Sequence, residues 1–173
     1  KESFERDRPA AEERIRLIDE FAKTIEAGKA SKAELKLPDG LKLEISSDTA
    51  PTNTLTLQWD DVVLRAPNQS AKLQVAHGAG AALFNLRRSL NDPQPDTENA
   101  IKNVDSVLKP RYLCVVHVEK LQLPSGDFEA KTFTPGSVEF RVYVFDMVEK
   151  KELGSVSGKA ENDAKVEVRG KYK

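Results

Sequence analysis

The spacing of apolar residues predicts that the chain begins with a helix and continues into a sheet. Ile15, Ile18 and Ile25 recur at helical spacing and predict an amphipathic helix over residues 9–28. A proline suits the first turn of this helix, and a glycine suits its end. The preceding residues 1–8 are mostly polar, and we expect them to be frayed.

Leucines alternate with charged residues on both sides of Pro38-Asp39-Gly40. Proline presets the first dihedral of a turn and glycine can adopt a positive φ, so the sequence predicts a β-hairpin over residues 33–45. Its leucines would share one face, and its lysines and glutamates the other. This pattern is typical of antiparallel strands with one face in water.

The middle of the chain combines one strand with a helical region. Residues 54–59 alternate between apolar and polar positions and predict a strand. Residues 70–109 predict a helical region whose first helix starts at Ser70. Alternatively, residues 71–77 form a strand, and this helix starts at Gly80 because glycines weaken the earlier start.

A second, short helix in this region should have Asp96 or Thr97 as its N-cap and should end before Pro110. The run Tyr112–Val118 is apolar without alternation, which predicts a strand covered on both faces near the centre of the sheet. The remaining chain predicts an antiparallel meander over residues 111–168.

Two features of this meander bear on a possible contact surface. Pro124–Asp127 predicts a turn. Further on, valines alternate with a second set of residues that includes Tyr143 and Phe145, and Phe133 lies nearby in sequence. If the valines face the core, the second set is either covered by helices or forms an exposed contact patch of Tyr143, Phe145 and Phe133.

These elements together predict an α+β fold in one domain, residues 1–173. We expect a largely antiparallel sheet of six to seven strands with about three helices packed on it. The 27 Lys+Arg and 28 Asp+Glu residues give a net charge of −1, which argues against nucleic acid as a partner. No apolar run reaches the roughly 18 residues of a membrane-spanning helix.

Candidate chemistry is scarce. The chain has two histidines, His77 and His117, and one cysteine, Cys114. This is a poor set for a metal that needs three or four ligands, so we expect no metal site and no cofactor. Cys114 and His117 fall in the buried run and are expected to be core residues. Because no complete catalytic set is present, we do not expect an enzyme.

One loop could bind a ligand. In His77-Gly78-Ala79-Gly80, backbone amides before a helix could bind an anion, as in the oxyanion loop of lipases. The chain has no Gly-x-Ser-x-Gly nucleophile motif to accompany it, and glycines that allow close helix packing are the simpler interpretation. His77, Gly78 and Gly80 are therefore candidate ligand-binding residues, in a pocket between the 70–90 helix and the sheet.

A resemblance extends over the C-terminal half of the chain. Its pattern is a buried strand, a loop ending in Pro-Gly, a strand ending in Phe-Asp, and a return strand ending near Ala-x-Asn. These motifs lie in Arg111–Val118, Phe133–Asp146 and Leu153–Asn162. Over about residues 96–163, the pattern resembles small bacterial envelope lipoproteins of unknown function. It is more loosely similar to penicillin-binding-protein activators and to the N-terminal domain of the Tol-system β-propeller protein.

The resemblance implies a non-enzymatic domain of the periplasm or cell envelope that binds another protein or a cell-wall component. A chain that starts at Lys1 would fit a removed signal peptide, a lipid anchor upstream or a trimmed domain. Such an anchor would be the only contact with a membrane. The alternatives are a small-ligand-binding module and a cytoplasmic location.

Overall fold

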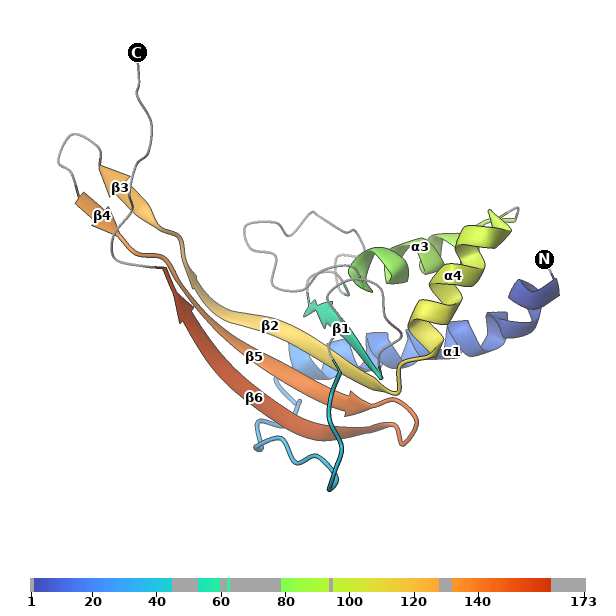
Figure 1. The fold of residues 1–173 in the computed structure, drawn as a ribbon, viewed down its shortest axis with the longest axis horizontal. Coiled ribbons are helices and arrows are strands. Elements are labelled where there is room, and N and C mark those ends of the chain that lie inside the picture. Colours follow the sequence, from blue (N-terminus) through green and yellow to red (C-terminus); the bar gives the residue numbers. More distant parts are fainter. Residues whose placement is uncertain are drawn as a thin grey trace, which may run out of the picture. The chain divides into compact units, whose positions relative to one another are not determined.

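Figure 1 shows the helices and strands of the computed structural model. The chain divides into two compact units. Unit 1 comprises the described residues of Lys1–His117 and Val142–Val156, and unit 2 comprises those of Val118–Arg141 and Ser157–Lys173. The structure describes residues 2–44, 53–59, 62, 79–93, 95–127 and 132–162.

The described elements confirm an α+β fold. Four strands form one sheet in the order β1-β2-β5-β6, and β3 pairs with β4 in a separate two-stranded sheet. The elements are α1 (Glu2–Glu26), β1 (Thr54–Gln58), α3 (Ala79–Asn91), α4 (Thr97–Leu108), β2 (Tyr112–Gln122), β3 (Ser125–Asp127), β4 (Thr132–Thr134), β5 (Ser137–Asp146) and β6 (Lys151–Glu161).

The main sheet is smaller and less uniform than predicted. Among the described residues it has four strands, against the six to seven predicted, and two more strands form the separate sheet. Strand β1 pairs with β2 in parallel, with Leu55 opposite Leu113. A parallel pair requires a long crossover between its strands, and α3 and α4 lie in that connection. The prediction of a largely antiparallel sheet overlooked this crossover.

Helix α1 starts a full two turns earlier than predicted. Residues 2–8 are helical rather than frayed, and the side chain of Phe4 is buried in the core. Pro9 therefore lies inside the helix, where it removes one backbone hydrogen bond. Burial of Phe4 offsets this loss, because a buried phenylalanine stabilises the fold by about 1.5–3 kcal/mol. The end of the helix near Gly28, which has φ 65°, agrees with the prediction.

The turn at Pro38-Asp39-Gly40 forms as predicted, but the hairpin does not. The backbone N–H of Leu41 donates to the Pro38 carbonyl at 3.0 Å, and Gly40 has φ 76°. The leucine segments on either side are not paired as strands. Their leucines are half-buried and their charged residues exposed, so the alternation predicted the faces correctly but not the bonding partner.

Residues 33–44, here called the strap, instead contact the regions of the two outer strands. The N–H of Leu35 donates to the carbonyl of Ser155 in β6 at 3.1 Å. Near its other end, the carbonyl of Lys42 accepts a hydrogen bond of 2.8 Å from the side chain of Asn53, the residue before β1. The strap is therefore held at one end by β6 and at the other by the residue that leads into β1.

The helices that follow agree closely with the sequence. Helix α3 begins at Ala79, which matches the alternative start at Gly80, whereas residues 71–77 lie outside the described residues. Helix α4 is capped by Asp96, whose carboxylate accepts a hydrogen bond from the N–H of Asn99. Asp96 is one of the two N-caps that the sequence predicted, and α4 ends before Pro110 as expected.

The helices cover one face of the sheet within unit 1 (Figure 1). Alternate residues of β1, β2 and β5 join apolar side chains of all three helices in one core. The ring of Phe145 stacks on Phe21 of α1, with ring centroids 4.2 Å apart. Tyr143 and Phe145 are thus buried, and neither forms part of an exposed contact patch. Of the two arrangements predicted for these residues, burial beneath helices is the one observed for both.

Unit 2 has a different composition of elements. It contains β3, β4 and the portions of β2, β5 and β6 that fall within its residues. Pro124–Asp127, predicted as a turn, contributes β3, in which Gly126 is opposite Phe133 of β4. None of its described hydrophobic residues is buried, and every buried hydrophobic residue in the described chain belongs to unit 1.

Candidate functional site

The structure does not bring the predicted ligand-binding residues together. His77 and Gly78 lie outside the described residues, and Gly80 is half-buried at the beginning of α3. Phe133, the third residue of the predicted contact patch, is half-buried in β4 of unit 2.

Cys114 and His117 have structural surroundings in β2. Cys114 is buried, as predicted, and burial raises the pKa of its thiol to about 12. The thiol therefore stays protonated at neutral pH and is a poor nucleophile. His117 is half-buried, and its ring packs edge-to-face against Trp59 with centroids 5.3 Å apart.

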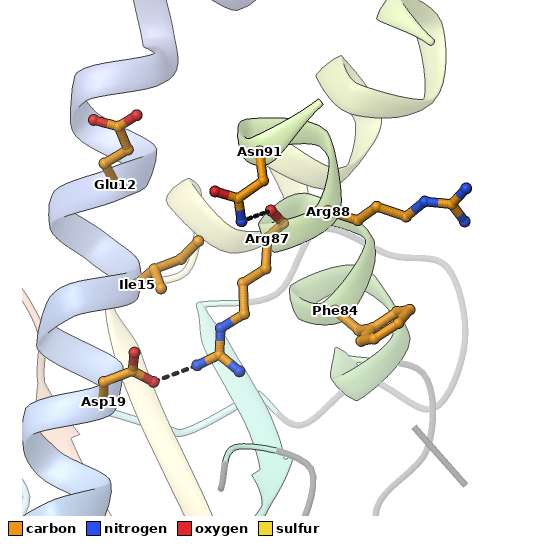
Figure 2. Close-up of a pocket in the computed structure, with 7 residues that line it drawn as sticks. All are labelled: Glu12, Ile15, Asp19, Phe84, Arg87, Arg88 and Asn91. Atoms are coloured by element: carbon orange, nitrogen blue, oxygen red, sulfur yellow. Dashed lines mark hydrogen bonds and ion pairs between the residues drawn. The ribbon is translucent and has the colours of Figure 1, made fainter. Parts of the chain in front are cut away.

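A pocket of about 330 Å³ lies between α1 and α3 (Figure 2). The predicted pocket had the same helix as one wall but the sheet as the other. Here a second helix forms the opposite wall, because residues at helical spacing on α1 and α3 face each other. Its lining residues are Glu12, Ile15, Asp19, Phe84, Arg87, Arg88 and Asn91.

An ion pair closes one end of this pocket. Arg87 of α3 donates to the carboxylate of Asp19 on α1, and both side chains are largely buried (Figure 2). The same guanidinium donates to the backbone carbonyl of Val62 at 3.2 Å. Arg87 thus links α1 and α3 and neutralises the charge of Asp19.

A second arginine links the same helices in the opposite direction. Arg8 of α1 donates to the backbone carbonyl of Leu90 near the end of α3. Its Nε atom also lies 3.1 Å from Glu12 Oε1 on its own helix. The pocket therefore lies between helices held by two long-range arginine contacts. The sequence carries no signal for these contacts, since the residues of both pairs are far apart in the chain.

The described lining of the pocket contains no histidine, cysteine, serine or threonine, and its two carboxylates, Glu12 and Asp19, are both paired with arginines. Across the part of the chain that the structure describes, no group of three His, Cys, Asp or Glu residues is placed to hold a metal ion. No helix in the described segments has the length and hydrophobicity needed to cross a membrane.

The Phe-Asp motif at the end of β5 has a structural role. Asp146 is 3% exposed, and its carboxylate accepts hydrogen bonds from Arg111 at 2.7 Å and from the backbone N–H groups of Val148 and Glu149 at 2.9 Å. Burial would raise the pKa of Asp146, but these donors outweigh it and hold the pKa below its ordinary value. The aspartate fixes the turn between β5 and β6.

Unit 2 presents neutralised charges and exposed leucines. Arg141 pairs with Glu119 at 3.0 Å, and Lys120 pairs with Glu139 at 3.1 Å. Close to these pairs on β2, Leu121 is 39% exposed, and Leu123, just after the strand, is 49% exposed. Neither leucine was predicted as a site residue, although both lie where the apolar run of β2 gives way to alternation.

Comparison with known proteins gives no match for this chain: no protein-family model, curated protein or solved structure is significantly similar to it.

Proposed function

We propose that the protein is a non-enzymatic binding domain and that unit 2 contacts a partner protein through Leu121 and Leu123. The observation that carries the proposal is the exposure of two large apolar side chains in a unit whose described residues include no buried hydrophobic side chain. Contiguous exposed apolar surface is typical of an interaction site, and Leu121 and Leu123 are two positions apart in the chain.

Three further features support binding rather than chemistry. The described charges of β2 and β5 in unit 2 are paired, so an apolar partner surface would meet little unpaired charge. Among the described residues that line the pocket between α1 and α3, both carboxylates are paired with arginines, and no histidine, cysteine, serine or threonine is present. The resemblance of residues 96–163 to envelope lipoproteins is our reason for proposing a partner in the bacterial periplasm or cell envelope, with a cell-wall component as the alternative.

Site-specific photocrosslinking tests this proposal. A photoreactive amino acid replaces Leu121 or Leu123 in the full chain, expressed in the cells that naturally produce it. Val148 is the matched control, because it is a 58% exposed apolar residue of unit 1. We expect the same protein adduct from both leucine positions and none from Val148.

A substitution then tests whether the contact is required. With the crosslinker at Leu123, Leu121→Asp should abolish the adduct, whereas Val148→Asp should retain it. Equal adducts at Leu121 and Val148, or no protein adduct at either leucine, would overturn the proposal. Adducts with cell-wall fragments alone would replace the protein partner with the alternative. Thermal unfolding of each variant checks that the fold is retained.

A further inference from the structure

Strand β6 forms one edge of the main sheet, and β5 is its only neighbouring strand among the described residues. The strap bonds to the backbone of β6 at Leu153 and Ser155. Beyond that contact, residues 157–161 complete the strand within unit 2. All of them are exposed except Gly158, which is half-buried. Residues 157–161 are here called the open edge.

Alternation along β6 determines which backbone groups of the open edge point away from β5. The N–H of Asn162 donates to the carbonyl of Gly136, the residue before β5, at 3.0 Å, so the backbone of Asn162 faces β5. Successive residues of a strand direct their backbone groups to opposite sides. The N–H and C=O groups of Ser157, Lys159 and Glu161 therefore point outward, where the described residues supply no bonding partner. Such an edge is a template for a further strand.

The charges of the open edge complement a second copy of the same strand. Lys159 and Glu161 share one face of β6 and form an ion pair, with side chains 55% and 56% exposed. If two copies pair antiparallel around Ala160, Lys159 of each copy lies opposite Glu161 of the other. The adjacent registers place lysine opposite lysine or glutamate opposite glutamate, and like charges directly opposite are destabilising. One register is therefore favoured.

The other residues of the open edge are compatible with this approach. The segment contains no proline, and the residue on the two-fold axis would be the small Ala160. A Cβ at Gly158 would lie 2.6 Å from the ring of Phe140, so this ring of β5 lies against β6 and helps to hold it in the sheet. A lysine on an edge strand normally opposes strand addition, but here Glu161 of the second copy would offset its charge.

We propose that the protein forms a symmetric dimer in which the open edges of two copies pair antiparallel around Ala160. Lys159 of one copy and Glu161 of the other would exchange two backbone hydrogen bonds. The contact is short, and interfaces below about 1,200 Å² are typically weak, so we expect a reversible dimer. It is separate from the surface at Leu121 and Leu123 and does not depend on the partner proposed for it.

Sedimentation velocity of the full chain tests for this dimer. Over a range from about 10 µM to about 1 mM, which suits a weak interface, we expect the weight-average sedimentation coefficient to rise. Amide shifts of the ¹⁵N-labelled chain should change over the same range at Lys159 and Glu161. A protein that stays monomeric over the whole range would overturn the proposal.

Reversal of either charge tests the register. Lys159→Glu and Glu161→Lys each place like charges opposite one another, so each variant alone should dimerise about tenfold more weakly or worse. An equimolar mixture of the two variants should dimerise again, because the acidic pair of one complements the basic pair of the other. A mixture that stays monomeric would overturn the proposal.

A matched pair of variants controls for net charge. Lys102→Glu and Glu98→Lys make the same charge changes in an exposed ion pair of α4, and each should dimerise as the wild type does. Equal weakening by these variants would overturn the proposal. So would dimerisation that is lost in Leu121→Asp but retained in both open-edge variants, since it would place self-association at the leucine surface. Thermal unfolding of each variant checks that the fold is retained.

Discussion

Units 1 and 2 use the same strands in two different ways. In unit 1, residues of β1, β2 and β5 are buried beneath three helices, and Phe145 stacks on Phe21. In unit 2, β2 and β5 continue without any fully buried apolar side chain among the described residues. A strand can therefore be continuous while its energetic role changes along its length. Burial stabilises the first part, and exposure leaves the second part available for contact.

The largest expected effect tests the core side of this comparison. Phe145→Ala should reduce the free energy of unfolding by about 3–5 kcal/mol, because it removes a fully buried ring and leaves a cavity. Phe140→Ala, in the half-buried part of β5 that belongs to unit 2, should cost clearly less. Urea unfolding of both variants measures the difference, and equal losses would contradict the distinction between the units.

The contact between the strap and β6 gives the next effect. Gly154 has φ 120°, and a Cβ there would lie 2.8 Å from the carbonyl oxygen of Glu34. Gly154→Ala should cost about 3 kcal/mol, since strain and a backbone clash add. Gly28→Ala is the control: its φ is 65° and a Cβ there would have no atom within 4 Å, so strain alone should cost about 1 kcal/mol.

Amide hydrogen exchange distinguishes release of the strap from general destabilisation. In Gly154→Ala, the amide of Leu35 should exchange faster relative to amides in the core of β2, because its acceptor is the carbonyl of Ser155. Gly28→Ala should not change that ratio. Uniform acceleration in both variants would show that the strap is not the element affected.

The buried aspartate of unit 1 predicts a pH dependence. Asp146→Asn should cost about 2 kcal/mol at neutral pH, because buried hydrogen bonds to a charged acceptor are lost. The pKa of Asp146 is lower in the folded protein than in the unfolded chain. Its contribution is therefore complete above the unfolded pKa of about 3.9 and is lost as pH falls through the folded pKa.

Urea unfolding of wild type and Asp146→Asn from neutral to acidic pH measures this dependence. The stability difference between them should shrink as the solution is acidified below the unfolded pKa. Glu139→Gln, in an exposed ion pair of unit 2, is the control and should have a small effect at every pH. A difference for Asp146→Asn that grows on acidification would contradict the assigned sign.

The smallest effect concerns the paired charges of unit 2. A double-mutant cycle on Lys120 and Glu139 should give a coupling free energy below about 1 kcal/mol, because the lysine is well exposed. The coupling should decline as salt is added. A coupling of several kcal/mol that resists salt would contradict the assignment of this ion pair to the exposed surface of unit 2.

Short stretches of sequence predicted the elements that are specified by their own residues. The N-cap Asp96 and the unbroken apolar run of β2 were sufficient to predict α4 and a buried central strand. The early start of α1 was missed because Pro9 suggested a first turn, whereas tertiary burial of Phe4 extends the helix beyond it. The strap was misread as a hairpin because alternation records which side of a segment is buried, not which strand supplies its hydrogen bonds.

The pocket between α1 and α3 was beyond prediction for a related reason. In the sequence, an aspartate and an arginine such as Asp19 and Arg87 are expected at the surface. Only the packing of two helices that are distant in the chain brings them into contact. The loop at His77 was predicted as a candidate site because its motif lies within a few consecutive residues. A site formed by long-range contacts between common residues leaves no such motif.

The strap has a consequence for how the protein behaves at high concentration. Outer strands of a sheet expose backbone groups to which the strand of another molecule can add, and this is a common route to aggregation. The N–H of Leu35 already donates to the Ser155 carbonyl of β6, and the N–H of Ser155 donates to the Ala33 carbonyl. Strand addition at this point therefore requires the molecule to release part of its own chain first. We expect the strap to block strand addition at this part of β6 as well as to support the fold.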